Sequence, residues 1–332
     1  MISKSQLEMI RLRNSKRNGE LKRLKKAPKW LEPLTAERGY TASLYLYTFQ
    51  IRKAITENLI PKIPKWLELS TLTYPDPVDP ILDGQISGMC KKNIDSANLI
   101  KNDDIIDDVI AELNATLEFI DFLLIGPEQR AIDSAKLFGL EVAAFNNVQY
   151  KKSVDQVLAV DIFVEEPWLE PQLELFANQN AQLITNMTDN EINRVSGIVQ
   201  RGLQEGSSLE SITESIEKSF GITRRHAKLI ARDQTSKLNG SLTKLRQQNL
   251  GVQTYKWLTA GDERVRQSHR VLDGRICRWD DPTVFLNVKT GEWVKRSTIG
   301  GTEVHTSQDV NCRCQPIAQF EDMFNGGNRR ER

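Results

Sequence analysis

The apolar residues of this 332-residue chain change their periodicity at Gly251, and this change constrains the fold more than any other feature. Before that point they recur at helical spacing, as they do from Ile192 to Leu203 and from Leu209 to Phe220. After it, short runs of β-branched and aromatic residues alternate with turn residues, which is typical of strands. The sequence therefore predicts an α+β protein, with mainly α-helical N-terminal and middle regions and a small loop-rich β domain at the C-terminal end.

The helices before residue 188 are predicted from apolar runs and prolines. A first helix is expected from Ala36 to Leu59, closed by Pro61 and Pro64, and two more are expected over 86–126. Pro127 should open the next helix. Three further segments are predicted: a proline-rich linker at 70–84, a strand at 157–164, and after it a long helix that Pro167 begins.

Residues 188–250 predict three consecutive helices joined by short turns. Capping-box patterns begin at Thr188 and Ser207, and each precedes an apolar stripe. Gly206 and Gly221 stand where the first two helices should stop, and Thr223 should cap the third.

The β domain should contain a strand at 252–257, a hairpin at 284–294 and a last strand at 313–318. These patterns divide the chain into five segments: a basic arm at 1–29, a mostly helical acidic region at 30–165, a helical unit at 166–251, the β domain at 252–320 and a polar tail at 321–332.

The net charge of +1 conceals a strong segregation of charge along the chain. Residues 1–29 carry ten Lys or Arg and two Glu, and residues 101–180 carry sixteen acidic and five basic residues. The basic segments can face a polyanion, although solvated helix faces explain them equally well. The sequence contains no apolar run long enough for a membrane span and no secretory signal, and its four cysteines do not form a disulfide scaffold. We therefore expect assembly in a reducing cytoplasm.

A cluster of cations on the third helix is a candidate DNA-contacting surface. Five basic side chains fall within a sector of about 100°: Arg224, Arg225, Lys228, Arg232 and Arg246. No aromatic residues interleave with them, which favours contact with backbone phosphate over base stacking. The alternatives are an exposed helix face or salt bridges to the acidic region.

Two of the three histidines and three of the four cysteines lie within the β domain. Thiolate and imidazole are ligands that zinc prefers, and a structural metal can hold together a small domain with a thin core. The candidate ligands are His269, Cys312 and Cys314, with Cys277 or His305 as the fourth. The alternatives are buried thiols beside a hydrogen-bonded histidine, or a disulfide that forms later, after assembly.

A box of charged residues surrounds His269 and has two interpretations. Its members are Asp262, Arg264, Arg266, His269 and Asp273. As phosphate clamps and acid–base groups they would form a nuclease-like site, whereas as loop ties they would have a structural role. The sequence lacks a P-loop, a dinucleotide-binding turn and a His-Glu-x-x-His motif, so it is not expected to be an enzyme of those classes. A free DNA-binding regulator is disfavoured because no helix-turn-helix pattern stands out.

Three sequence boxes stand out, and they read GITRRHAKLIARDQT at 221–235, DERVRQSH at 262–269 followed by LDG, and DVNCRC at 309–314. Together they resemble the boxes of the phage head morphogenesis family, the minor head proteins of the Mu F and SPP1 type. The resemblance covers about 165–318 and, more weakly, 28–60. Thr306 and Ser307 stand where the family usually has Pro-Gly, and the family is not expected to keep a ligand at Cys277 or His305.

The resemblance implies a virion protein that joins the procapsid early, beside the portal and in a few copies. It implies a role in head assembly and in DNA packaging or ejection. The implied partners are the portal protein, the capsid and scaffold proteins of the procapsid, and double-stranded DNA bound without sequence specificity. Eighteen residues follow Cys314, so no toxin or nuclease domain is expected after the last box.

Overall fold

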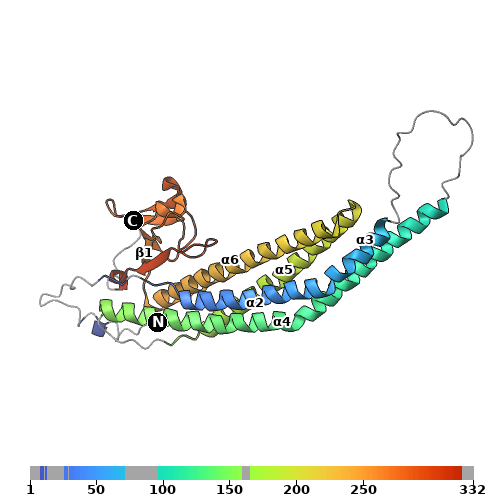
Figure 1. Ribbon diagram of the computed structural model, residues 1–332. Helices are drawn as coiled ribbons and strands as arrows, with labels where there is room; N and C mark the ends of the chain where they lie inside the picture. Colours follow the sequence, from blue (N-terminus) through green and yellow to red (C-terminus); the bar gives the residue numbers. More distant parts are fainter. Residues whose placement is uncertain are drawn as a thin grey trace, which may run out of the picture. The chain divides into compact units, whose positions relative to one another are not determined.

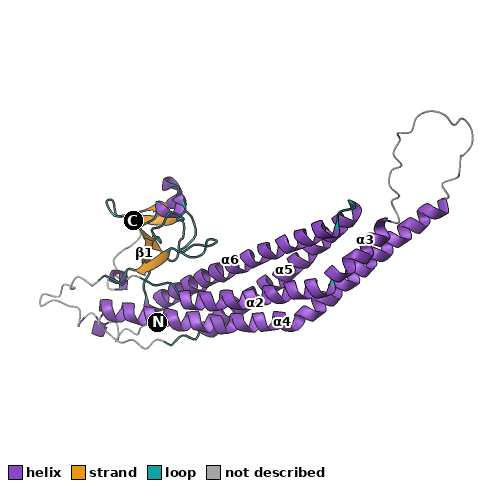
Figure 2. Ribbon diagram, viewed as in Figure 1, coloured by secondary structure: helices purple, strands orange, loops and turns teal. Residues whose placement is uncertain are grey.

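The computed structural model describes residues 8–10, 12, 26–28, 30–71, 96–158 and 165–323. Within these residues the chain is helical up to Leu250 and forms its strands after that point, which confirms the predicted α+β class (Figures 1 and 2). The long helices are α2 (Leu34–Asn58), α4 (Ser96–Leu158), α5 (Leu169–Gln204) and α6 (Leu209–Leu250), and between α2 and α4 lie the short η1 (Ile60–Lys62) and α3 (Ile63–Thr71).

The chain divides into two compact units, and each of the four long helices contributes residues to both. One unit contains 1–41, 134–180 and 229–332, and is called the C-terminal unit here because it includes the sheet. The other contains 42–133 and 181–228 and is entirely helical where it is described; it is called the helical unit.

Buried polar side chains join the helices of the helical unit. The Tyr47 hydroxyl of α2 donates to Glu128 Oε2 of α4 at 3.1 Å and also pairs with Thr188 of α5. Glu191 of α5 is fully buried and accepts hydrogen bonds from Ser219 and Thr223 of α6. Because a buried carboxylate is stable only when it is paired, these contacts fix the register of α5 against α6.

The predicted division of 188–250 into three helices is wrong at two of its boundaries. Thr188 lies inside α5, and Gly221 and Thr223 lie inside α6. A glycine in a helix interior destabilises the helix by only about 1 kcal/mol. Burial of the apolar stripes on either side stabilises it by more than that. The break at Gly206 is confirmed, with φ of 64°, although the following helix is capped by Ser208 and not by Ser207.

Proline positions also misled the sequence prediction. Helix α4 is continuous through Pro127, and the adjacent Glu128 is held by Tyr47 and by Thr185 at 2.5 Å. These contacts and the buried stripe of α4 offset the cost of about 3 kcal/mol for an internal proline. After α2 the chain continues through η1 and α3, where Pro61 and Pro64 occupy first-turn positions that need no N–H donor.

Several predicted segments fall largely outside the described residues. The predicted strand at 157–164 is described only at its first two residues, Val157 and Leu158, which close α4. The linker at 70–84 is described only at 70–71, and the tail only at 321–323. Of the basic arm, Ile10 is described and buried in an apolar cluster with Trp30 and Tyr150. Helix α5 starts at Leu169, close to the expected Pro167.

The C-terminal unit contains a five-stranded antiparallel sheet of order β4-β3-β2-β1-β5. The strands are β1 (Thr254–Leu258), β2 (Ile276–Arg278), β3 (Val284–Asn287), β4 (Glu292–Lys295) and β5 (Gln315–Ala318). The first strand, the β3–β4 hairpin and the last strand are confirmed. Strand β2 was missed, because three residues are too few to show an alternating pattern.

The sheet packs on an aromatic core and is tied to α6. Buried Tyr255, Trp257, Trp279 and Phe285 lie in one cluster with the three described cysteines. The Gln247 side chain of α6 donates to the Pro316 carbonyl at 2.9 Å and accepts from Trp279 Nε1 at 3.0 Å.

None of the helices in the described part of the chain combines the length and apolar character that crossing a bilayer requires.

Candidate functional site

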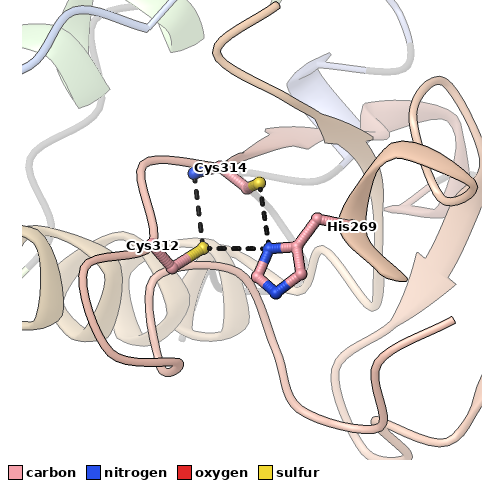
Figure 3. A group of neighbouring side chains, drawn as sticks. All are labelled: His269, Cys312 and Cys314. Carbon is pink, nitrogen blue, oxygen red and sulfur yellow. Dashed lines mark hydrogen bonds between the residues drawn. The ribbon is translucent and has the colours of Figure 1, made fainter. Parts of the chain in front are cut away.

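Three side chains predicted as metal ligands converge in the C-terminal unit. His269 comes from the short helix α7 (Gln267–Arg270), and Cys312 and Cys314 come from the segment before β5 (Figure 3). The His269 Nδ1 atom lies 3.4 Å from Cys314 Sγ and 3.5 Å from Cys312 Sγ. All three residues are buried, with at most 4% of their surface exposed. They are therefore shielded from solvent and arranged around one point.

The other ring nitrogen of His269 is held by Asp309. His269 Nε2 lies 2.9 Å from Asp309 Oδ2, and Arg266 NH1 lies 3.4 Å from the same carboxylate oxygen. The half-buried Asp309 accepts a hydrogen bond from Nε2, and this bond turns Nδ1 toward the two thiols. This arrangement suits a histidine that acts as a ligand through Nδ1.

The acidities of the three groups are displaced from their ordinary values. Hydrogen bonding from Cys314, helped by His269, lowers the pKa of the Cys312 thiol, whereas the bond to Cys312 together with burial raises the pKa of Cys314. The contact with Cys312 and the carboxylate of Asp309 raise the pKa of His269 against the opposing effect of burial. The site therefore favours a thiolate beside the imidazole.

The segment that carries the two cysteines is fastened to α6. The Ser236 hydroxyl donates to the Cys312 carbonyl, and the Asn311 backbone N–H donates to Asp233 Oδ1 at 2.7 Å. Within the segment, the Ser307 hydroxyl donates to the Cys314 carbonyl at 2.9 Å. Two of the sequence boxes, in α6 and at 309–314, are thus in direct contact.

The charged box around His269 mostly ties loops together. Asp262 pairs with Arg313, and this partner holds the pKa of the Asp262 carboxyl below its usual range. Arg266 also donates to the Val310 carbonyl at 2.7 Å. Asp273 accepts from the Thr259 backbone N–H at 2.8 Å and is not part of the cluster at His269, and Arg264 is exposed.

The expected fourth ligand is corrected by the structure, because neither Cys277 nor His305 belongs to the group. Cys277 lies on β2 between Tyr255 and Phe285, and burial raises the pKa of its thiol. His305 pairs with the Tyr255 hydroxyl at 3.0 Å. The pairing of β2, which the sequence did not reveal, places Cys277 outside the group, and the bond to Tyr255 holds His305 outside it.

The candidate DNA-contacting cations do not have one common environment. Arg224, Arg225 and Lys228 are exposed in the helical unit, and the Arg224 guanidinium lies 4.6 Å from the centre of the Tyr45 ring. Arg232 is half-buried in the C-terminal unit, where its charge acts on Glu32.

Arg246 is not part of an exposed surface, which corrects its assignment as a DNA contact. It is 1% exposed, and its Nε lies 2.6 Å from Glu166 Oε1. Its NH1 donates to Asn146 Oδ1 at 2.5 Å. Periodicity gives the direction of a side chain on its own helix but not which neighbouring helix covers that direction, and here the residues of α4 do so.

Comparisons with known proteins agree with the sequence boxes. Residues 193–317 match the family described as Phage Mu protein F like protein, which confirms the resemblance to the head morphogenesis family. Over 182 residues the chain is 27% identical to an uncharacterized protein of Haemophilus influenzae, covering 54% of this chain and 37% of that protein. Over 132 residues it is 27% identical to minor head protein GP7 of Bacillus phage SPP1, covering 38% of this chain and 40% of that protein.

The chain thus spans less than half the length of both relatives. No solved structure matches it significantly.

Proposed function

Because residues 193–317 carry the domain of the phage head morphogenesis family, we propose that this chain is a minor head protein of a tailed bacteriophage. It is present in the virion head and is assembled in the host cytoplasm. It joins the procapsid in a few copies beside the portal protein, in contact with capsid and scaffold proteins. There it acts in head assembly and in DNA packaging or ejection.

The observation that carries the proposal is that the sequence boxes meet in one packed structure. Asp233 and Ser236 of α6 hold the 309–314 segment, and His269 of α7 reaches the cysteines of that segment. Residue types that could serve catalysis are used here to join structural elements. This favours a structural component over an enzyme.

The nuclease alternative requires a free ring nitrogen at His269, and the contacts disfavour it. Its Nδ1 faces two thiols and its Nε2 faces Asp309, while only 2% of the residue is exposed. A general base must reach the proton it removes from a bound substrate. Incubation of the purified protein with double-stranded and single-stranded DNA and divalent metals tests this alternative, and cleavage lost in a His269→Ala variant would revive it.

Non-specific DNA contact is supported by exposed charge. Arg224, Arg225 and Lys228 present three cations on two consecutive turns of α6, and residues 1–29 add a net charge of +8 in the sequence. Such cations attract phosphate without reading bases. Binding of this kind is weak, tolerant of sequence and sensitive to salt.

Quantitative mass spectrometry of purified procapsids and mature heads tests the proposed location. The expected result is a constant copy number far below that of the major capsid protein, in particles washed at high salt. A non-virion phage protein made at the same time serves as the contamination control. Absence from the particles, or a level equal to that control, would contradict the proposal.

Cross-linking of the same particles tests the proposed partner. Cross-links from this chain to the portal protein are expected in procapsids that lack DNA. If its cross-links run only to the major capsid protein at sites away from the portal vertex, the portal association is wrong while a place in the head survives.

A further inference from the structure

The geometry points to a zinc centre formed by His269 Nδ1, Cys312 Sγ and Cys314 Sγ, with Asp309 as the residue that orients the histidine. The inference does not depend on the viral role proposed above. It concerns what holds the C-terminal unit together.

The first argument is that two sulfur atoms converge on one ring nitrogen. Cys314 Sγ and Cys312 Sγ lie 3.4 Å and 3.5 Å from the same Nδ1 atom. A ring nitrogen carries either one proton or one lone pair, so it makes a good hydrogen bond with only one thiol at a time. A cation placed among the three atoms satisfies all of them simultaneously.

The second argument comes from the distances. Zinc binds nitrogen at about 2.0–2.1 Å and sulfur at about 2.3 Å, which at tetrahedral angles separates the nitrogen from each sulfur by about 3.5 Å. The observed nitrogen–sulfur distances of 3.4 Å and 3.5 Å agree with this value. The three ligand atoms all lie within 4.8 Å of one another, as a shared ion requires.

The third argument is the support behind the histidine. A histidine that binds zinc usually donates its other N–H to a carboxylate, which fixes the tautomer and the ring orientation. Asp309 Oδ2 lies 2.9 Å from His269 Nε2, and the Arg266 guanidinium lies 3.4 Å from the same oxygen. Asp309 is thus a positioning residue and not a ligand.

Charge balance is consistent with the burial of such a centre. Two thiolates and a neutral imidazole around Zn²⁺ have no net charge, whereas two unpaired buried thiolates would be costly. Soft thiolate ligands select zinc over magnesium or calcium. Among the described residues no fourth His, Cys, Asp or Glu joins the group, so the fourth position goes to water or to a ligand from elsewhere.

The zinc would act as a cross-link. His269 belongs to α7, and the two cysteines belong to a segment that Ser236 and Asp233 attach to α6. Binding of the ion joins these elements where the sheet core is small, and its binding energy becomes folding energy. We infer a structural role, with the ion shielded from substrate.

Metal analysis of the full chain, purified without chelators from zinc-supplemented cells, tests the inference directly. About one equivalent of zinc is expected in the wild type and in Cys277→Ser, which removes an equally buried cysteine of the same core that lies outside the group. Cys312→Ser and Cys314→Ser should each lose the metal. Less than about a tenth of an equivalent in the wild type, or iron or copper in place of zinc, would overturn the assignment.

Cobalt substitution keeps the test decisive if the cysteine variants fail to fold. Co²⁺ in the wild type should give an intense thiolate-to-cobalt charge-transfer band and the visible bands of a tetrahedral site. Asp309→Ala should retain zinc with affinity about 10–100-fold weaker, measured by competition with a chromogenic chelator. A wild-type spectrum without the charge-transfer band, or an Asp309→Ala affinity equal to wild type, would contradict the proposed centre and its positioning residue respectively.

Discussion

Gly240 of α6 lies directly against Ser307 of the loop that leads to the two cysteines. A Cβ atom built on Gly240 would stand 2.5 Å from the Ser307 Cβ and 2.9 Å from its Oγ. Ordinary carbon–carbon contacts lie at about 3.5–4.0 Å, so no side chain fits between helix and loop here. The absence of a side chain at Gly240 is therefore what lets the Cys-x-Cys segment approach α6.

Gly240→Ala should destabilise the C-terminal unit by about 1–3 kcal/mol, because the added methyl group must push the loop away from the helix. Gly221→Ala is the matched control in the same helix, where the nearest atom is a flexible guanidinium nitrogen of Arg225 at 3.7 Å. That change should stabilise by about 0.5–1 kcal/mol. Urea unfolding of the wild type and the two variants measures both changes in the free energy of unfolding. An equal destabilisation at the two positions would mean that close contact with Ser307 is not what excludes a side chain at Gly240.

Ser307 has a left-handed backbone with φ of 65°, a conformation that glycine adopts without strain. Ser307→Gly removes a strain of about 1–2 kcal/mol and also loses the hydrogen bond to Cys314, so it should change stability little. Ser307→Ala keeps the strain and loses the bond, and should destabilise by about 1 kcal/mol. Thermal unfolding of the two variants shows which of them is more stable. An alanine variant as stable as the glycine variant would show that the left-handed backbone at position 307 is not strained.

The buried Arg246 forms an ion pair with Glu166, whose side chain is 15% exposed, and removal of Arg246 leaves this carboxylate without its partner. Arg246→Met should therefore cost about 3–5 kcal/mol of folding stability. Arg52→Met breaks an ion pair with Glu217 whose side chains are 53% and 39% exposed, and should cost at most about 1 kcal/mol. Denaturant titration compares the two, and similar costs would mean that burial does not govern this pair.

The salt dependence of DNA binding should respond to the exposed cations only. Replacement of Arg224, Arg225 and Lys228 by Gln should lower the slope of log K against log salt by up to about 3. Addition of Arg232→Gln should add little, because that cation is half-buried beside Glu32. The control is Lys151→Gln with Lys152→Gln, two exposed cations of α4. Fluorescence anisotropy of labelled DNA at several salt concentrations measures the slopes. An unchanged slope in the triple variant would mean that these three cations face solvent and do not contact DNA.

His305 should make stability depend on pH. Burial lowers its pKa to about 4, and the charges of Lys244 and Arg296 act in the same direction. The unfolded chain, with a histidine pKa of about 6.5, binds the proton first, so stability is complete above pH 6.5 and falls as the pH drops toward 4. The loss is about 2 kcal/mol after allowance for screening.

His305→Gln, which cannot be protonated, should show a smaller loss of stability than the wild type between pH 6.5 and pH 5. Carboxyl groups contribute little in that interval, so the difference between the two proteins isolates the histidine. Urea unfolding at the two pH values provides the measurement. Parallel losses in both proteins would mean that His305 is protonated as easily in the folded state as in the unfolded one.

The sequence predicted well those features that depend on local chemistry. The change from helices to strands, the turn at Gly206 and the β3–β4 hairpin follow from periodicity and from residues suited to turns. His269, Cys312 and Cys314 were identified because few other residues in the β domain carry a thiol or an imidazole, and the structure brings them together.

Features set by contacts distant in sequence were predicted poorly. Gly221 and Pro127 looked like helix ends because the buried partners that sustain their helices, such as Glu191 and Tyr47, lie elsewhere in the chain. Arg246 looked exposed because Glu166 is 80 residues away. The sequence did not distinguish Cys277 from the other candidate cysteine ligands. Only the pairing of β2 in the structure shows that Cys277 lies outside the group.

The partners that close the C-terminal unit are widely spaced along the chain. Ser236 precedes its partner Cys312 by 76 residues, and His269 precedes Cys314 by 45. Contacts between residues so far apart in sequence require the closure of a long loop, which lowers the entropy of the chain before the contact contributes any favourable energy. Such contacts therefore form late in folding. During synthesis α6 leaves the ribosome well before the segment that docks on it. Translation therefore sets the earliest time at which this domain can close.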